Sequence, residues 1–129
     1  MTVLPNIARP FRNILLVLWA LLVLWLSLDP SPPVPENELF GWDKLQHAAA
    51  YALMTFLAGF AFHAYSDNFY RSWFAAAGMS IAYGGLIELL QGWCTEARSA
   101  EFGDLVADTI GAVVVLAVVS AVRYFRIAR

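Results

Sequence analysis

The sequence contains little charge for its length. Of its 129 residues only 14% are charged, against roughly a quarter in ordinary soluble domains. A soluble protein of this size covers most of its surface with polar groups, and ten acidic plus eight basic residues are too few for that. The shortage of charge excludes an ordinary soluble enzyme, a disordered chain and a nucleic-acid-binding protein, which would need a basic patch.

Cysteine is also scarce. Cys94 is the single cysteine, so the chain can form neither an intrachain disulfide framework nor a thiolate metal cluster. The sequence also lacks internal repeats and a glycine-rich phosphate loop. We expect Cys94 to be a small apolar residue at a helix end rather than a nucleophile, because no histidine is adjacent in sequence.

Long hydrophobic runs are what the sequence does have. Four stretches approach the roughly 20 residues that a helix needs to cross a bilayer, and they cover residues 11–28, 42–65, 72–93 and 104–122. The first could be a signal peptide, but no small-x-small cleavage site follows Leu28, so we expect a retained helix. The sequence predicts an all-α integral membrane four-helix bundle, in one domain over residues 1–129.

Basic residues gather on one side of the predicted membrane. With four crossings, both termini and the turn near residues 66–71 share a side, which holds Arg9, Arg12, Arg71, Arg123, Arg126 and Arg129. The other side holds only Lys44 and Arg98, beside seven acidic residues. Because cytoplasmic loops carry an excess of Lys and Arg, we expect both termini to be cytoplasmic. The chain is then a multi-pass protein of the bacterial plasma membrane.

Polar side chains inside membrane helices are costly and by default indicate a functional site. Eight stand near the outer ends of the last three stretches: Asp43, Lys44, His47, Tyr51, Glu88, Gln91, Asp104 and Asp108. At 1.5 Å rise per residue, His47 and Asp108 lie roughly 6 Å inside their helix starts, and Glu88 roughly 9 Å from its helix end. Arg98, on the loop between the last two stretches, can reach the same level. We predict one outward-facing polar site from these nine residues.

A row of small residues helps to orient this site. Ser80 and Gly84 precede Glu88 at steps of four, and small residues at this spacing let another helix approach closely. Glu88 should therefore point into the bundle.

Structural roles are the alternative for the same residues. Asp43 and Asp104 stand at predicted helix N-termini, where capping alone accounts for a carboxylate. A purely structural polar network is the alternative for the rest. A zinc site needs three or four ligands. Because Lys44 and Arg98 would compete for the acids, we predict no metal and no cofactor.

The order and spacing of these residues resemble the VanZ-like family. Four pieces carry the resemblance along residues 43–119, namely Asp43-Lys44-x-x-His47, Glu88-x-x-Gln91, Arg98 and Asp104-x-x-x-Asp108-x-x-Gly111. The family often has asparagine at the position of Asp108. Its founding member is associated with resistance to the glycopeptide teicoplanin. The resemblance implies a small polytopic membrane protein with an envelope-related role, and it implies no particular reaction.

Three classes of function fit these features. The first is an accessory or binding protein, whose site contacts a lipid-linked envelope precursor or a lipoglycopeptide, with Lys44 and Arg98 holding a phosphate or carboxylate. The second is a membrane enzyme in which Glu88 and His47 act as acid and base on a lipid-linked substrate. The third is a structural or transport subunit that works as an oligomer. We favour the first, with the lipid bilayer as a partner and no nucleic acid.

Overall fold

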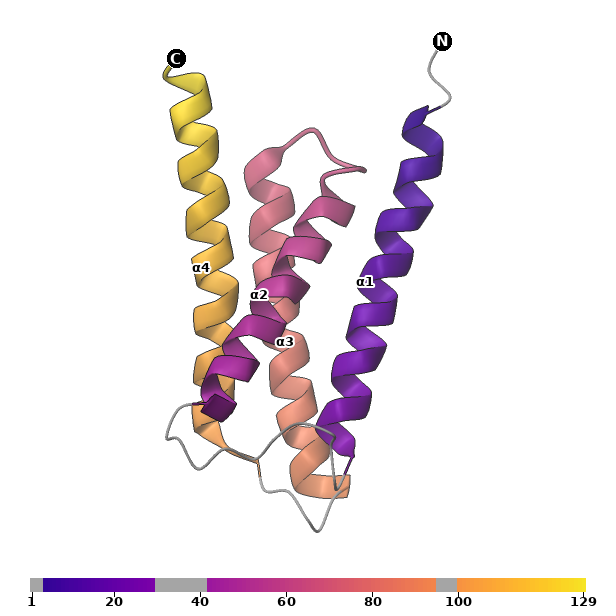
Figure 1. The fold of residues 1–129 in the computed structure, drawn as a ribbon, viewed down its shortest axis with the longest axis vertical. Helices are drawn as coiled ribbons and strands as arrows, with labels where there is room; N and C mark the ends of the chain where they lie inside the picture. Colours follow the sequence, from indigo (N-terminus) through magenta and orange to yellow (C-terminus); the bar gives the residue numbers. More distant parts are fainter. Residues whose placement is uncertain (1–3, 30–41, 95–99) are drawn as a thin grey trace.

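The computed structural model describes residues 4–29, 42–94 and 100–129. Every regular element in these ranges is helical, in the order α1 (Leu4–Leu28), α2 (Trp42–Phe62), α3 (Phe69–Cys94) and α4 (Phe102–Ile127) (Figure 1). Each helix contains a segment long and apolar enough to cross a membrane. Within the described ranges, the predictions of an all-helical fold and of four helices able to span a membrane are confirmed.

Helices α1 and α4 extend beyond the predicted apolar stretches. α1 begins at Leu4 rather than near residue 11, and α4 continues to Ile127 rather than ending near residue 122. Hydropathy marks the part of a helix that fits the hydrocarbon core. The hydrogen-bonded backbone continues into the interface, where charged side chains such as Arg126 are well tolerated. The added turns therefore carry basic residues.

The turn between α2 and α3 shifts both helix ends by three residues. Beyond Phe62 the chain tightens into i→i−3 hydrogen bonds, which end α2 before the predicted residue 65. The side-chain oxygen of Asn68 then accepts a 3.0 Å hydrogen bond from the Arg71 amide. This is the bond of an N-cap residue. It starts α3 at Phe69 instead of the predicted residue 72.

Helices α2, α3 and α4 pack through small residues. A Cβ added to Gly111 of α4 would collide with the Ala48 carbonyl oxygen of α2, so these two backbones are in direct contact. Gly59 of α2 makes room in the same way for the Trp73 ring of α3. Lipid tails are as apolar as the side chains, so close van der Waals contact at small residues is what holds such helices together.

Helix α1 is attached differently. Among its described side chains only Val23 is buried. Three side-chain donors reach backbone carbonyls across its boundary, namely Trp19 to Ala50 at 3.0 Å, Tyr83 to Ala20 at 2.7 Å and Gln91 to Ser27 at 2.8 Å. Helix α1 lies at the edge of the bundle, against α2 and α3. Hydrogen bonds therefore supplement the small apolar contact that holds it there.

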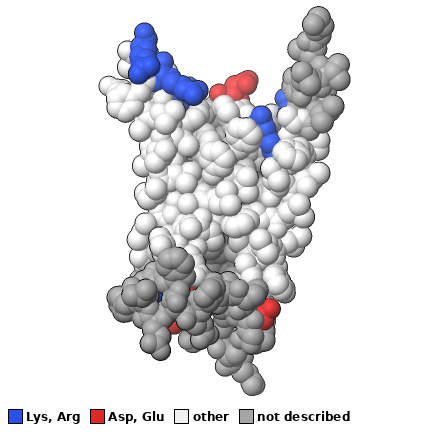
Figure 2. Space-filling model, viewed as in Figure 1, with Lys and Arg blue, Asp and Glu red and all other residues white. Residues whose placement is uncertain are grey.

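The bundle has two distinct ends. The start of α1 and the end of α4 lie at one end of the bundle, here called the terminus end, and the end of α1 and the start of α4 lie at the other, here called the loop end (Figure 1). Figure 2 shows Lys and Arg side chains at the terminus end and an uncharged band below them on the visible face. Because α2 and α4 begin at the loop end and α3 ends there, their polar side chains share one level.

Candidate functional site

Charged side chains from three helices converge at the loop end. They come from the first two turns of α2, the last two turns of α3 and the start of α4. We call this set the polar cluster, and it consists of Asp43, Lys44, His47, Glu88, Glu101, Asp104 and Asp108. Helices α2, α3 and α4 each contribute side chains, so no pair of neighbouring helices could form the polar cluster alone.

Lys44 organises one half of the polar cluster, here called the outer part, which consists of Lys44, Asp43, Glu101 and Asp104. Its ammonium donates to Asp104 in a very short contact and to Glu101 at 2.8 Å, and it lies 3.6 Å from the carboxylate of Asp43. The hydrogen bond from Lys44 lowers the pKa of the exposed Glu101 carboxyl below its usual value. One ammonium is thus shared among three carboxylates, and Lys44 is already occupied rather than offered to a phosphate.

His47 links the outer part to the interior. Its Nδ1 lies 3.0 Å from Asp108 Oδ1, and its Nε2 lies 3.6 Å from Asp104 Oδ2. Both ring nitrogens therefore face carboxylates of α4. Asp108 is only 1% exposed, so this carboxylate depends on the imidazole beside it to offset the cost of burial.

Glu88 brings a second buried carboxylate from α3. Its Oε2 accepts a 2.8 Å hydrogen bond from the amide of Glu101, the N-cap residue of α4. Its Oε1 is buried and has no hydrogen-bond partner in the described part of the chain. One donor atom each from His47, Glu88 and Asp108 lies within 4.8 Å of the others. We call these three residues the inner triad.

Gly84 provides the space that the inner triad needs. A Cβ at this position would lie 2.6 Å from Asp108 Oδ2 and 3.2 Å from Tyr51 Cε1. Tyr51 is 2% exposed and packs behind the carboxylate. The glycine that precedes Glu88 by one turn is therefore where α3 admits the buried aspartate of α4.

The predicted site residues fall into four groups. Six belong to the polar cluster: Asp43, Lys44, His47, Glu88, Asp104 and Asp108. Tyr51 packs against it, and Gln91 donates to α1. Arg98 lies outside the described residues.

One member of the polar cluster was missed from the sequence. Glu101 binds both Lys44 and Glu88, the first through its carboxylate and the second through its amide. Glutamate is not among the residues preferred at an N-cap, and Glu101 makes no side-chain capping bond. The sequence therefore carries no signal that Glu101 belongs to the site.

Carboxylates outnumber cations in the polar cluster. Five of them face one lysine and one histidine among the described residues: Asp43, Glu88, Glu101, Asp104 and Asp108. The expectation that Lys44 holds an anionic ligand group does not fit this balance. The described part of the site is suited to a cationic partner.

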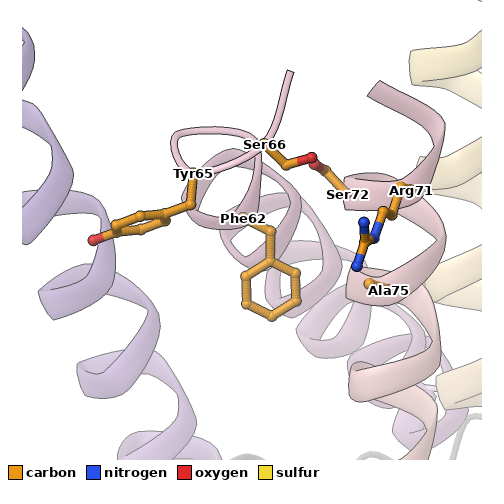
Figure 3. Close-up of a pocket in the computed structure, with 6 residues that line it drawn as sticks. All are labelled: Phe62, Tyr65, Ser66, Arg71, Ser72 and Ala75. Atoms are coloured by element: carbon orange, nitrogen blue, oxygen red, sulfur yellow. The ribbon is translucent and has the colours of Figure 1, made fainter. Parts of the chain in front are cut away.

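A recess at the opposite end has a different character. It is lined by Phe62, Tyr65, Ser66, Arg71, Ser72 and Ala75 (Figure 3). The Tyr65 side chain extends toward α1, where its hydroxyl accepts a 2.7 Å hydrogen bond from the Asn13 amide. The Ser72 hydroxyl donates to the Asn68 carbonyl at 3.1 Å. These polar groups hold the α2–α3 turn and its contact with α1, so we assign no site there.

Comparison with known proteins identifies no relative. No family model matches the sequence, and neither a curated protein nor a solved structure matches the chain. The geometry of the polar cluster therefore carries the functional argument, and the resemblance of its motifs to the VanZ-like family stays a prediction.

Proposed function

We propose that the chain is a VanZ-like accessory protein of the bacterial cell envelope that binds a lipid-linked ligand at the outer face of the plasma membrane. The observation that carries the proposal is the polar cluster. Side chains from three apolar helices meet near one end of the bundle, a depth at which lipid headgroups are within reach. A helix bundle that only has to span the membrane does not need ionisable side chains directed into its interior.

The orientation rests on the basic residues. The described Lys and Arg side chains outside the polar cluster belong to the terminus end. An excess of basic residues is typical of the cytoplasmic side. In this orientation the polar cluster faces outward.

The charge balance indicates which part of a ligand is bound. The carboxylates of Asp43 and Glu101 are 70% and 57% exposed, so they are accessible from the headgroup layer. Amino groups pair favourably with such carboxylates. We therefore propose that the amines of a lipid-linked precursor or a lipoglycopeptide, rather than its phosphates, contact this outer part.

A membrane enzyme is the second candidate, and the pairing of His47 with buried Asp108 favours it. A carboxylate that orients an imidazole is a common arrangement for general acid–base catalysis. However, a catalytic imidazole needs one ring nitrogen directed at the substrate, and both nitrogens of His47 face carboxylates. Binding therefore fits the geometry better than proton transfer.

Glu88→Gln tests the proposed function in cells. We expect the variant to insert and fold but to lose the phenotype of the wild type, measured as sensitivity to a lipoglycopeptide or another envelope stress in a deletion strain. Asp67→Asn neutralises an exposed carboxylate at the terminus end and serves as the control with full activity. A Glu88→Gln protein that keeps full activity, or one that simply unfolds, would contradict the proposal.

The orientation has a separate test. On a Cys94→Ala background, a membrane-impermeant maleimide should label Glu38→Cys in intact cells and Arg71→Cys only after lysis. The opposite labelling pattern would place the polar cluster on the cytoplasmic side and remove the proposed encounter with envelope precursors.

A further inference from the structure

We propose that the inner triad of His47, Glu88 and Asp108 binds a divalent transition-metal cation of the zinc type. The proposal goes beyond the function above, since it needs neither the membrane orientation nor a particular lipid-linked ligand. It rests on three features of the described residues: the spacing of the donor atoms, an unpaired buried carboxylate oxygen and the distribution of charge.

The donor atoms are close to the spacing that a metal requires. They lie within 4.8 Å of one another, and His47 Nδ1 is 3.0 Å from Asp108 Oδ1. Zinc–ligand bonds of about 2.0–2.2 Å place neighbouring ligand atoms about 3–3.5 Å apart. The Glu88 oxygen lies within 4.8 Å of both other donor atoms, and three different helices supply one ligand each.

Glu88 provides the second, independent observation. It is 7% exposed, and its Oε1 has no hydrogen-bond partner in the described ranges. A buried carboxylate oxygen without a partner is costly. The amide of Glu101 holds Oε2 and so orients the carboxylate, which leaves Oε1 as the atom that a cation in the triad would satisfy.

The surroundings of His47 fit a ligand rather than a simple ion pair. Asp104 Oδ2 lies 3.6 Å from Nε2, on the side of the ring away from the triad contact at Nδ1. A metal-bound histidine usually has a carboxylate or carbonyl facing its second nitrogen, which fixes the ring and its tautomer. Asp104 is placed to perform this role.

The distribution of charge answers the objection raised from the sequence as far as Lys44 is concerned. A metal was not expected because Lys44 and Arg98 would compete for the acids. The ion pairs of Lys44 go to Asp43, Glu101 and Asp104, in the outer part. They leave Glu88 and Asp108 to the triad. Two buried carboxylates and a neutral imidazole carry two negative charges, which a divalent cation balances.

The ligand set indicates the class of metal. Imidazole nitrogen suits zinc, iron, cobalt and nickel, whereas calcium and magnesium prefer all-oxygen sites. Three protein ligands leave at least one coordination position for water. We therefore expect an exchangeable ion rather than a closed structural site.

Cobalt titration tests the site directly. The full chain with Cys94→Ala, purified in detergent and stripped with a chelator, should bind Co²⁺ at about one per chain with visible absorption bands, and Zn²⁺ should displace it. Glu88→Gln and Asp108→Asn should each weaken binding by more than about tenfold. Asp67→Asn, which removes an exposed carboxylate at the terminus end, should leave the affinity within about twofold.

Thermal unfolding of the unsubstituted chain gives a readout that does not depend on variants folding. Saturating Zn²⁺ should raise its Tm by about 5 °C, because the metal binds only the assembled triad. Absence of both Co²⁺ bands and a Tm shift would overturn the proposal. So would loss of binding in Asp67→Asn with retention in Glu88→Gln. These measurements use purified protein, so a failed cellular phenotype would count against the proposed function and not against the metal.

Discussion

The two ends of the bundle place their charges in opposite ways. At the loop end some of the charged groups are buried between helices, and Glu88 and Asp108 are 7% and 1% exposed. At the terminus end the described arginines are exposed or half-buried, and several contact aromatic rings. The Arg12 guanidinium is 3.9 Å from the centre of the Phe60 ring, and that of Arg123 is 4.5 Å from the centre of the Phe69 ring.

This difference separates two uses of charge in a membrane protein. Arginines on interfacial rings keep water and headgroups within reach, so they can anchor the helices without a carboxylate partner inside the bundle. Carboxylates between helices need partners at set positions, so helix packing and charge must agree. Substitutions at the loop end should therefore cost more stability than equivalent ones at the terminus end.

The largest effect should come from Gly111→Ala, about one turn beyond Asp108 toward the terminus end. The new methyl group would meet the Ala48 backbone, which cannot rotate away, so α2 and α4 must separate. We expect a loss of about 3 kcal/mol in the free energy of unfolding, measured by denaturant titration in mixed micelles. Gly78→Ala is the matched control, since nothing lies within 4 Å of a Cβ there. Equal stability of the two variants would refute the close contact.

The two histidines compare the ends directly. His47→Ala removes the partner of Asp108 and leaves a buried carboxylate, so we expect a loss of about 2 kcal/mol. His63 is exposed at the terminus end, where its ring makes a T-shaped contact with the Phe69 ring, with the ring centres 5.9 Å apart. His63→Ala should change the free energy of unfolding by less than about 0.5 kcal/mol. A larger loss for His63→Ala than for His47→Ala would reverse the comparison.

Arg123→Gln should have a smaller effect. The substitution removes the guanidinium from the rings of Phe69 and Tyr70, and such contacts contribute about 0.5–1 kcal/mol at accessible sites. Arg123→Lys keeps the charge and should recover part of the loss in the same unfolding assay. If Arg123→Gln proved as damaging as His47→Ala, the terminus end too would depend on fixed internal partners.

The smallest effect concerns pH. Pairing with Lys44 lowers the pKa of Glu101 in the folded chain, so this pair stabilises the fold above the unfolded-state pKa, near 4.5, and the contribution is lost as pH falls through the folded value. For an exposed carboxylate we expect less than about 1 kcal/mol. The stability difference between wild type and Glu101→Gln should be present at pH 7 and shrink as the pH falls below about 4.5. A difference that grows on acidification would be inconsistent with the pair.

Much of this arrangement could be predicted because the bilayer imposes it. Four apolar runs of sufficient length fix the number of crossings, and alternating crossings fix the common level of His47, Glu88 and Asp108. The small-residue spacing that ends at Gly84 also indicated that Glu88 points inward, as it does in the structure. These inferences need only periodicity and length.

The remaining details depend on packing that periodicity does not encode. The rotation of α4 and the position of Glu101 at its N-terminus decide which carboxylates pair with Lys44. Gln91 was assigned to the site, yet it donates to the Ser27 carbonyl because α1 docks beside the end of α3. No sequence spacing relates positions 27 and 91, so that contact could not be predicted.

The way α1 is held has a consequence for how the chain can change over evolution. Two of its hydrogen bonds are accepted by its own backbone, at the carbonyls of Ala20 and Ser27. Every amino acid supplies a carbonyl, so substitutions at these two positions keep the acceptor while the donors Tyr83 and Gln91 stay on α3. We therefore expect homologues to keep both acceptors whichever residues stand at positions 20 and 27, while Tyr83 and Gln91 on α3 stay constant.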